Sequence, residues 1–148
     1  MTDLREGGCA CGAIRYRVRG KPERVAACYC TFCQRRTGGA LSIHAWFPKD
    51  AVALTGSGLS TYETRSDENN NWLRLHFCSR CATTVMITLE KRQDVCLITG
   101  GTLDDPNSIA IDAHIFTRSA QHWMAFPKNA ACYETTSFAG IRRQSAAR

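Results

Sequence analysis

The stretch Cys28-Tyr-Cys-Thr-Phe-Cys33 places three thiols within six residues, and a pair of cysteines lies on either side of it along the chain. These pairs are Cys9-Ala-Cys11 and Cys78-Ser-Arg-Cys81. A tetrahedral zinc site takes four ligands, so two all-thiolate sites need one sulfur more than the seven in these clusters. Structural zinc is saturated by protein, whereas reactive zinc keeps one position for water or substrate. The count therefore predicts one closed four-cysteine site and one site with three protein ligands.

The closed site is predicted from the two outer clusters. Cys78-Ser-Arg-Cys81 lies between two strand-like runs and has the spacing of a zinc knuckle, and Cys9-Ala-Cys11 offers a second bidentate arm. Metal binding at Cys9, Cys11, Cys78 and Cys81 would couple the N-terminal region to the middle of the chain and contribute to folding. The first arm could instead pair with Cys28 and Cys30, and simple packing of the thiols in a core is the alternative to metal binding.

The remaining triplet, Cys28, Cys30 and Cys33, is predicted to be catalytic. Three thiolates give Zn²⁺ a net negative charge, which makes it a weaker Lewis acid than zinc held by neutral imidazoles. Such a site suits a soft fourth ligand, and a substrate thiol would be deprotonated there. We expect that thiolate to attack an electrophile such as an aldehyde, or to leave in the reverse elimination.

A fourth protein ligand would instead close the second site. The candidates are His44, His76, His114, Cys96 and Cys132. The two cysteines also fit the pattern of buried thiols that act as small hydrophobes, and a histidine in a strand is commonly a packing residue. Iron in the four-cysteine site is a further alternative, because tetrahedral sulfur sites accept either metal.

The rest of the sequence predicts a mainly β fold with little helix. Apolar residues alternate with arginines over 14–19 and with polar or bulky residues over 41–47, as in half-buried strands. Apolar, β-branched runs at 72–77, 83–89 and 95–99 are bounded by turn signals. Short helices are expected only near 31–37 and 104–108. Residues 1–148 are expected to form a single domain, with a flexible basic tail from about residue 138.

The net charge is +6, and no stretch is apolar enough to span a bilayer or act as a signal peptide. Clustered cysteines in such a chain favour a cytoplasmic, metal-binding protein with no membrane partner. The basic residues could attract an acidic small molecule or nucleic acid. Nucleic acid is not the expected partner, because there is no long basic arm or recognition helix. A non-catalytic zinc-binding module that recognises protein or nucleic acid is nevertheless the alternative to an enzyme.

These motifs together resemble the glutathione-dependent formaldehyde-activating enzyme family, which includes centromere protein V. The resemblance extends from about residue 8 to residue 123. It is carried by Gly8-Cys-Ala-Cys-Gly12, Cys28-Tyr-Cys-Thr-Phe-Cys-Gln-Arg-Arg-Thr-Gly38, Ala45-Trp-Phe-Pro48, Phe77-Cys-Ser-Arg-Cys81, Gly101-Thr-Leu-Asp-Asp-Pro106 and His114-Ile-Phe-Thr-Arg-Ser119. Tyr29 departs from the pattern, since family members often have histidine there, and Phe116 and Gln121-His122 depart from it near Trp123.

The resemblance implies a complex of small antiparallel β-sheets organised around zinc, a β-tent-like fold. It implies a structural zinc on Cys9, Cys11, Cys78 and Cys81 and a catalytic zinc on Cys28, Cys30 and Cys33. The implied activity is that of a carbon–sulfur lyase working in reverse, in which glutathione adds to formaldehyde to give S-(hydroxymethyl)glutathione.

Glutathione carries two carboxylates, so its site should offer cationic or amide donors. Arg35, Arg36, Thr37 and Gly38 directly follow the triplet and could supply them. The two arginines could equally lie on the surface and pair with Asp67, Glu68 or Glu90. His114 and Arg118 belong to a family-like segment that could face the same pocket.

Overall fold

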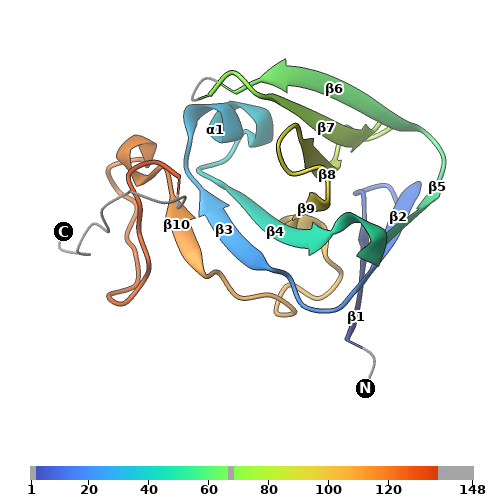
Figure 1. The fold of residues 1–148 in the computed structure, drawn as a ribbon, viewed down its shortest axis with the longest axis horizontal. Helices are drawn as coiled ribbons and strands as arrows, with labels where there is room; N and C mark the ends of the chain where they lie inside the picture. The colour runs from blue at the N-terminus through green and yellow to red at the C-terminus, as the bar shows by residue number, and fades with distance from the viewer. Residues whose placement is uncertain (1–2, 67–68, 137–148) are drawn as a thin grey trace. The chain divides into compact units, whose positions relative to one another are not determined.

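The computed structural model describes residues 3–66 and 69–136 of the 148-residue chain. Within these ranges strands dominate, and the one α-helix is seven residues long (Figure 1). The predicted fold class, mainly β with little helix, is therefore confirmed. No helix in this part of the chain has the length and apolar character needed to cross a membrane.

The chain divides into two compact units, and each is described by itself. The first comprises the described residues up to Glu23 and from Ala45 to Ile109, and the second comprises Arg24–His44 and the described residues from Ala110 onward. That residues 1–148 fold as a single domain stays a prediction. The expected basic tail from about residue 138 lies outside the described residues.

The first unit contains a three-stranded antiparallel sheet in the order β1-β2-β5. Its strands are β1 (Leu4–Gly8), β2 (Ile14–Arg19) and β5 (Val52–Gly56). Ile14, Tyr16 and Val18 are buried along β2, whereas Arg17 and Arg19 are exposed. The period-two pattern read from the sequence is thus confirmed, because alternate side chains of a strand point to opposite faces.

The same unit contains an antiparallel run of strands, β6 (Leu59–Arg65), β7 (Trp72–Cys78), β8 (Thr84–Leu89) and β9 (Val95–Thr99). The 3-10 turn η2 (Gly100–Thr102) follows β9, and the 3-10 turn η1 (Lys49–Ala51) precedes β5. β8 and β9 consist mainly of buried apolar residues, which explains why their sequences are continuous apolar runs. β6 is mostly exposed.

β4 (Ser42–Pro48) begins in the second unit and ends in the first. The alternation over 41–47 predicts a half-buried strand; the strand is present, but Ala45 and Phe47 are not its only buried residues. Ser42, His44 and Trp46 are also buried, so the strand is covered on both faces. A strand with both faces covered loses the contrast on which the alternation argument depends.

The second unit contains β3 (Arg24–Cys28), β10 (Ala113–Ile115), α1 (Thr31–Thr37) and the 3-10 turn η3 (Thr117–Ser119). β3 and β10 run side by side in parallel, with Ile115 opposite Cys28 (Figure 1). The helix is capped at its N-terminus by Cys30, whose sulfur accepts a hydrogen bond from the Cys33 N–H, and at its C-terminus by Gly38, whose φ of 67° suits glycine.

The helix expected near 104–108 is absent from the structure. This segment forms turns instead. The Asp105 side chain accepts a hydrogen bond from the Asn107 N–H, and its carbonyl accepts one from the Ser108 N–H. Such local hydrogen bonds compete with helix formation, which explains the error.

Candidate metal centres

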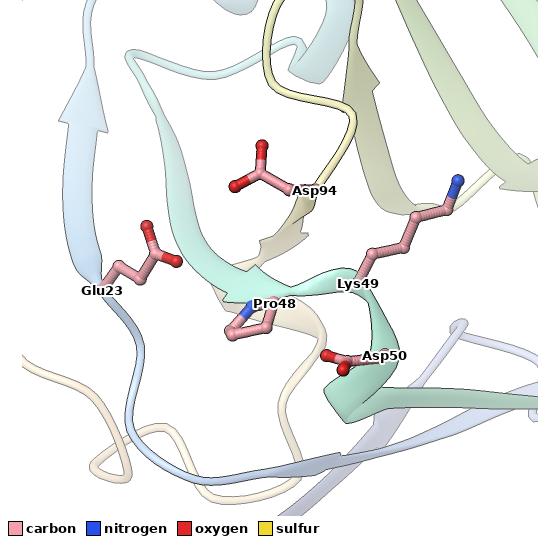
Figure 2. Close-up of a pocket in the computed structure, with 5 residues that line it drawn as sticks. All are labelled: Glu23, Pro48, Lys49, Asp50 and Asp94. Carbon is pink, nitrogen blue, oxygen red and sulfur yellow. The ribbon is translucent and has the colours of Figure 1, made fainter.

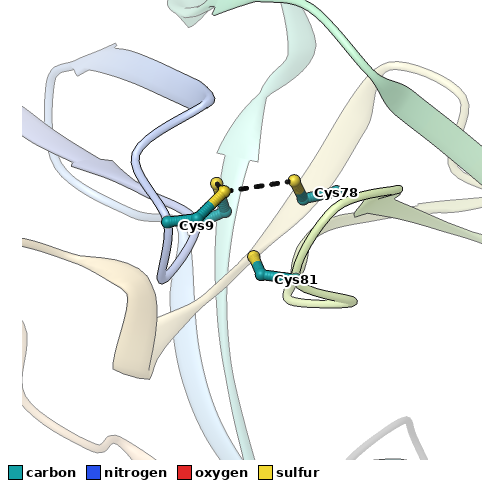
Figure 3. A group of neighbouring side chains, drawn as sticks. Cys9, Cys78 and Cys81 are labelled. Atoms are coloured by element: carbon teal, nitrogen blue, oxygen red, sulfur yellow. Dashed lines mark hydrogen bonds between the residues drawn. The ribbon is translucent and has the colours of Figure 1, made fainter.

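The first candidate centre joins the β1–β2 turn to the β7–β8 turn within the first unit. The sulfur atoms of Cys9, Cys11, Cys78 and Cys81 lie within 4.8 Å of one another. Figure 3 shows Cys9, Cys78 and Cys81 directing their sulfurs toward a common point. The predicted pairing of the two outer clusters is therefore what the structure shows, and the alternative pairing of the first arm with Cys28 and Cys30 is not.

Tight backbone turns hold the two cysteines of each arm close together. The Gly12 N–H donates to the Cys9 carbonyl in a turn that places glycine at a φ of 78°. On the other arm, Ala82 adopts a φ of 61°, and its N–H donates to the Cys78 carbonyl at 2.8 Å. A left-handed alanine is uncommon, so the knuckle keeps its two sulfurs together at some conformational cost.

Hydrogen bonds to sulfur favour thiolates, the form that binds metal. The Ile14 N–H donates to the Cys9 sulfur at 3.2 Å. The Thr83 hydroxyl lies 3.2 Å from the Cys81 sulfur and, with the Thr83 N–H, lowers the pKa of Cys81 to about 5. Sequence reasoning missed Thr83, although its place two residues after the knuckle was a usable signal.

The second candidate centre lies in the second unit, where β3 passes into α1. The sulfurs of Cys28, Cys30 and Cys33 lie within 4.8 Å of one another. Cys28 and Cys33 are buried, and Cys30 is half-buried. Hydrogen bonds with the Cys28 and Cys33 thiols lower the pKa of Cys30.

No fourth histidine, cysteine or carboxylate of residues 3–66 and 69–136 joins these three sulfurs at that distance. Four of the five candidates have other surroundings. His114 hydrogen-bonds to Tyr29, His76 hydrogen-bonds to Thr88, and Cys96 and Cys132 are buried thiols outside either group. His44, the fifth, is 8% exposed and close enough to Cys30 for their charges to interact.

Arg36 connects this centre to the start of β4. Its Nη2 donates to the Ser42 hydroxyl at 2.6 Å and lies 3.4 Å from His44 Nε2. Its Nε is buried and has no hydrogen-bond partner in the structure. Burial and the Arg36 charge lower the pKa of His44 to about 4, which keeps the imidazole neutral at pH 7.

The other residues expected to contact substrate are placed differently. Arg35 is exposed. The Thr37 hydroxyl donates to the Cys33 carbonyl and the Gly38 N–H to the Gln34 carbonyl, so both groups serve the end of α1. Of these four residues, Arg36 is therefore the one whose side chain we place at the candidate site, beside His44.

Both sulfur groups suit zinc, judged by their donor atoms. Four thiolates form a complete tetrahedral set, and three thiolates form the protein part of a site with one further ligand. The positive charge of Arg36 acts on the Cys33 sulfur in favour of its thiolate form, which also fits a centre of net negative charge. Each of the two cysteine groups could therefore hold a metal ion.

A pocket of about 620 Å³ in the first unit is a separate feature. It is lined by Glu23, Pro48, Lys49, Asp50 and Asp94 (Figure 2). Arg92 bridges the Glu23 and Asp94 carboxylates with hydrogen bonds of 3.1 and 2.9 Å. The Lys49 side chain points away from Glu23 in the figure. These carboxylates are already paired and no cysteine lines the pocket, so we do not regard it as the functional site.

Comparison with known proteins agrees with this description. The family model for the glutathione-dependent formaldehyde-activating enzyme matches residues 4–119, and the chain belongs to that family. A Halomonas elongata protein named "Putative glutathione-dependent formaldehyde-activating enzyme" is 34% identical over 87 residues, which are 57% of this chain and 55% of that protein. The chain thus matches about half the length of this curated relative.

The fold also resembles a solved structure. A crystal structure of a Rhodobacter sphaeroides protein superposes with a TM-score of 0.54 over 69% of this chain and 90% of the other. The two sequences are 19% identical, so this likeness concerns the fold alone.

Proposed function

We propose that the chain is a zinc-dependent enzyme of the carbon–sulfur lyase type, which adds glutathione to formaldehyde or catalyses the reverse reaction. The observation that carries this proposal is the group of three sulfurs from Cys28, Cys30 and Cys33, which no fourth ligand from the described residues completes. Membership of the family supports the choice of thiol and aldehyde.

Seven sulfurs would hold two zinc ions in this proposal. Cys9, Cys11, Cys78 and Cys81 would hold a structural ion, and Cys28, Cys30 and Cys33 a catalytic one. When bound at the second site, zinc would favour the thiolate form of the substrate at neutral pH.

The reaction forms one carbon–sulfur bond. The glutathione thiol loses its proton, its sulfur attacks the formaldehyde carbon, and the carbonyl oxygen takes up a proton to give S-(hydroxymethyl)glutathione. The reverse elimination breaks that bond and returns the proton to sulfur. Neither direction needs an oxidant or a reductant.

Arg36 is the side chain best placed to recognise the anionic substrate. Its guanidinium is anchored by Ser42, while its buried Nε–H keeps an unused donor. The positive charge of this guanidinium would attract a carboxylate of glutathione. His44 is neutral at pH 7, so it adds no competing positive charge beside Arg36.

The test follows free formaldehyde after mixing with glutathione, with and without zinc-loaded protein. Because thiols add to formaldehyde without a catalyst, the expected result is a rate above the uncatalysed one that is proportional to protein concentration. The Cys30→Ser variant should give only the uncatalysed rate. A parent protein that adds nothing to this rate in either direction overturns the proposal.

A further inference from the structure

Tyr29 lies between two of the three clustered cysteines and is 2% exposed. Its N–H donates to the Ile115 carbonyl at 3.0 Å, and its carbonyl accepts from Gln34 Nε2 at 2.8 Å. Its phenolic oxygen lies 2.8 Å from His114 Nδ1. Both backbone polar groups and the hydroxyl of this residue are therefore paired.

The Tyr29 ring is also packed from two sides. It stacks on His114 with centroids 5.8 Å apart and planes 26° apart. Phe126 meets Tyr29 and His114 edge-on, each at a centroid distance of 5.3 Å. Such aromatic contacts restrict the position of the ring beyond what burial alone achieves.

His114 is itself held in place by the chain that follows it. Its backbone N–H donates to the Ala131 carbonyl at 2.7 Å, and its backbone carbonyl accepts from the Tyr133 N–H at 2.9 Å. Phe126 and residues 131–133 lie beyond residue 119, where the family match ends. The support of Tyr29 thus includes a part of the chain outside the matched region.

We propose that Tyr29 and His114 are positioning residues that fix the sulfurs of Cys28 and Cys30 for metal binding. Tyr29 is covalently flanked by these two cysteines, so a shift of its backbone displaces both sulfurs. The phenolic hydrogen bond ties the Tyr29 side chain to His114 of β10, whose backbone is in turn bonded to Ala131 and Tyr133. This inference rests on the proposed metal site at the three cysteines and concerns its geometry.

The test uses the full-length protein and the variants Tyr29→Phe and His114→Phe, which keep a ring but remove the hydrogen bond. Zinc affinity is measured by competition with a chelator. One of the two sites should weaken by about 10-fold or more, the effect typical of losing a side chain that helps to orient metal ligands. The double variant should weaken it no further than either single variant, because all three lack the same bond.

A spectroscopic measurement separates positioning from general destabilisation. Cobalt(II) replaces zinc, and the visible bands of the two sites are compared. The variants should change the bands of one site and leave those of the four-cysteine site as in the parent. Tyr62→Phe, the same change at an exposed tyrosine of β6, should alter neither.

Unchanged zinc affinity and cobalt bands in both single variants would overturn the inference, as would equal weakening of the two sites. Neither readout uses turnover. A protein that binds two metal ions but does not consume formaldehyde would defeat the proposed reaction and leave this test intact.

Discussion

The sulfur of Cys11 lies 3.7 Å from the sulfur of Cys78, although 67 positions separate the two residues. Cys11 follows β1, and Cys78 ends β7, so this contact ties two sheets of the first unit together. A metal ion held there would close a long loop in the folded chain. Because metal binding is coupled to folding, this centre should contribute strongly to stability.

Replacement of Cys78 by serine should therefore destabilise the protein. Loss of one ligand from a closed site should lower the free energy of unfolding by about 3 kcal/mol or more. The matched control is Cys96→Ala, since Cys96 is equally buried but belongs to neither sulfur group. It should cost about 1 kcal/mol. Denaturant titration of the zinc-loaded proteins measures the free energy of unfolding of both variants. Similar unfolding midpoints for the two variants would contradict a structural role for Cys78.

Replacement of Cys30 by serine should abolish activity without destabilising the protein. The Cys30 sulfur accepts a hydrogen bond from the Cys33 N–H at 3.3 Å at the start of α1, and serine is a favourable residue at this position of a helix. We expect a parent-like thermal unfolding curve, loss of one bound metal ion and no formaldehyde consumption above the uncatalysed rate. Full activity with one metal ion lost would show that the three-cysteine centre is not catalytic.

Replacement of Arg36 by methionine should impair recognition of glutathione. Loss of a hydrogen bond between charged groups costs about 1.5 to 3 kcal/mol, which corresponds to a roughly 10- to 100-fold rise in KM with kcat little changed. Arg35→Met, a neighbouring exposed position, should stay near the parent value. An uncharged thiol should react equally well with all three proteins. A loss as large for that thiol as for glutathione would assign Arg36 another role.

His44 should make stability depend on pH. Its pKa is about 4 in the folded protein against 6.5 in an unfolded chain, so the unfolded state binds more protons between these values. The stabilisation from a neutral His44 is fully present above pH 6.5 and is lost as the pH falls toward 4. The difference corresponds to about 3 kcal/mol.

The His44→Gln variant should therefore lose stability less steeply than the parent over this range. Urea unfolding at a series of pH values gives the two slopes. Parallel curves would show that His44 does not carry the depressed pKa.

The cysteine spacing was sufficient to predict the three clusters, because side chains two or three residues apart can converge on one point wherever the backbone turns, but it left open which clusters pair. The strands 14–19 and 72–78 were also predictable, since their apolar residues recur with the strand period or in one run. The short helix expected near 31–37, directly after the cysteine triplet, is present as α1.

Other features depended on contacts between distant residues. His44 looked like an alternating strand residue, yet it is buried beside Arg36 because both faces of β4 are covered. The pairing of Tyr29 with His114 joins residues 85 positions apart and has no local signal. The turn at Asp105 shows that a side chain can divert a segment from the helix that its sequence suggests.

Cadmium NMR of the fully loaded protein, recorded with and without glutathione, tests the central claim most directly. Cadmium replaces zinc, and its resonance responds strongly to the number of bound sulfurs. We expect two resonances: glutathione should shift the one that Cys30→Ser abolishes and leave the other unmoved. Two resonances that are both unaffected by glutathione, or no resonance from the three-cysteine centre, would contradict binding of the thiol at that centre.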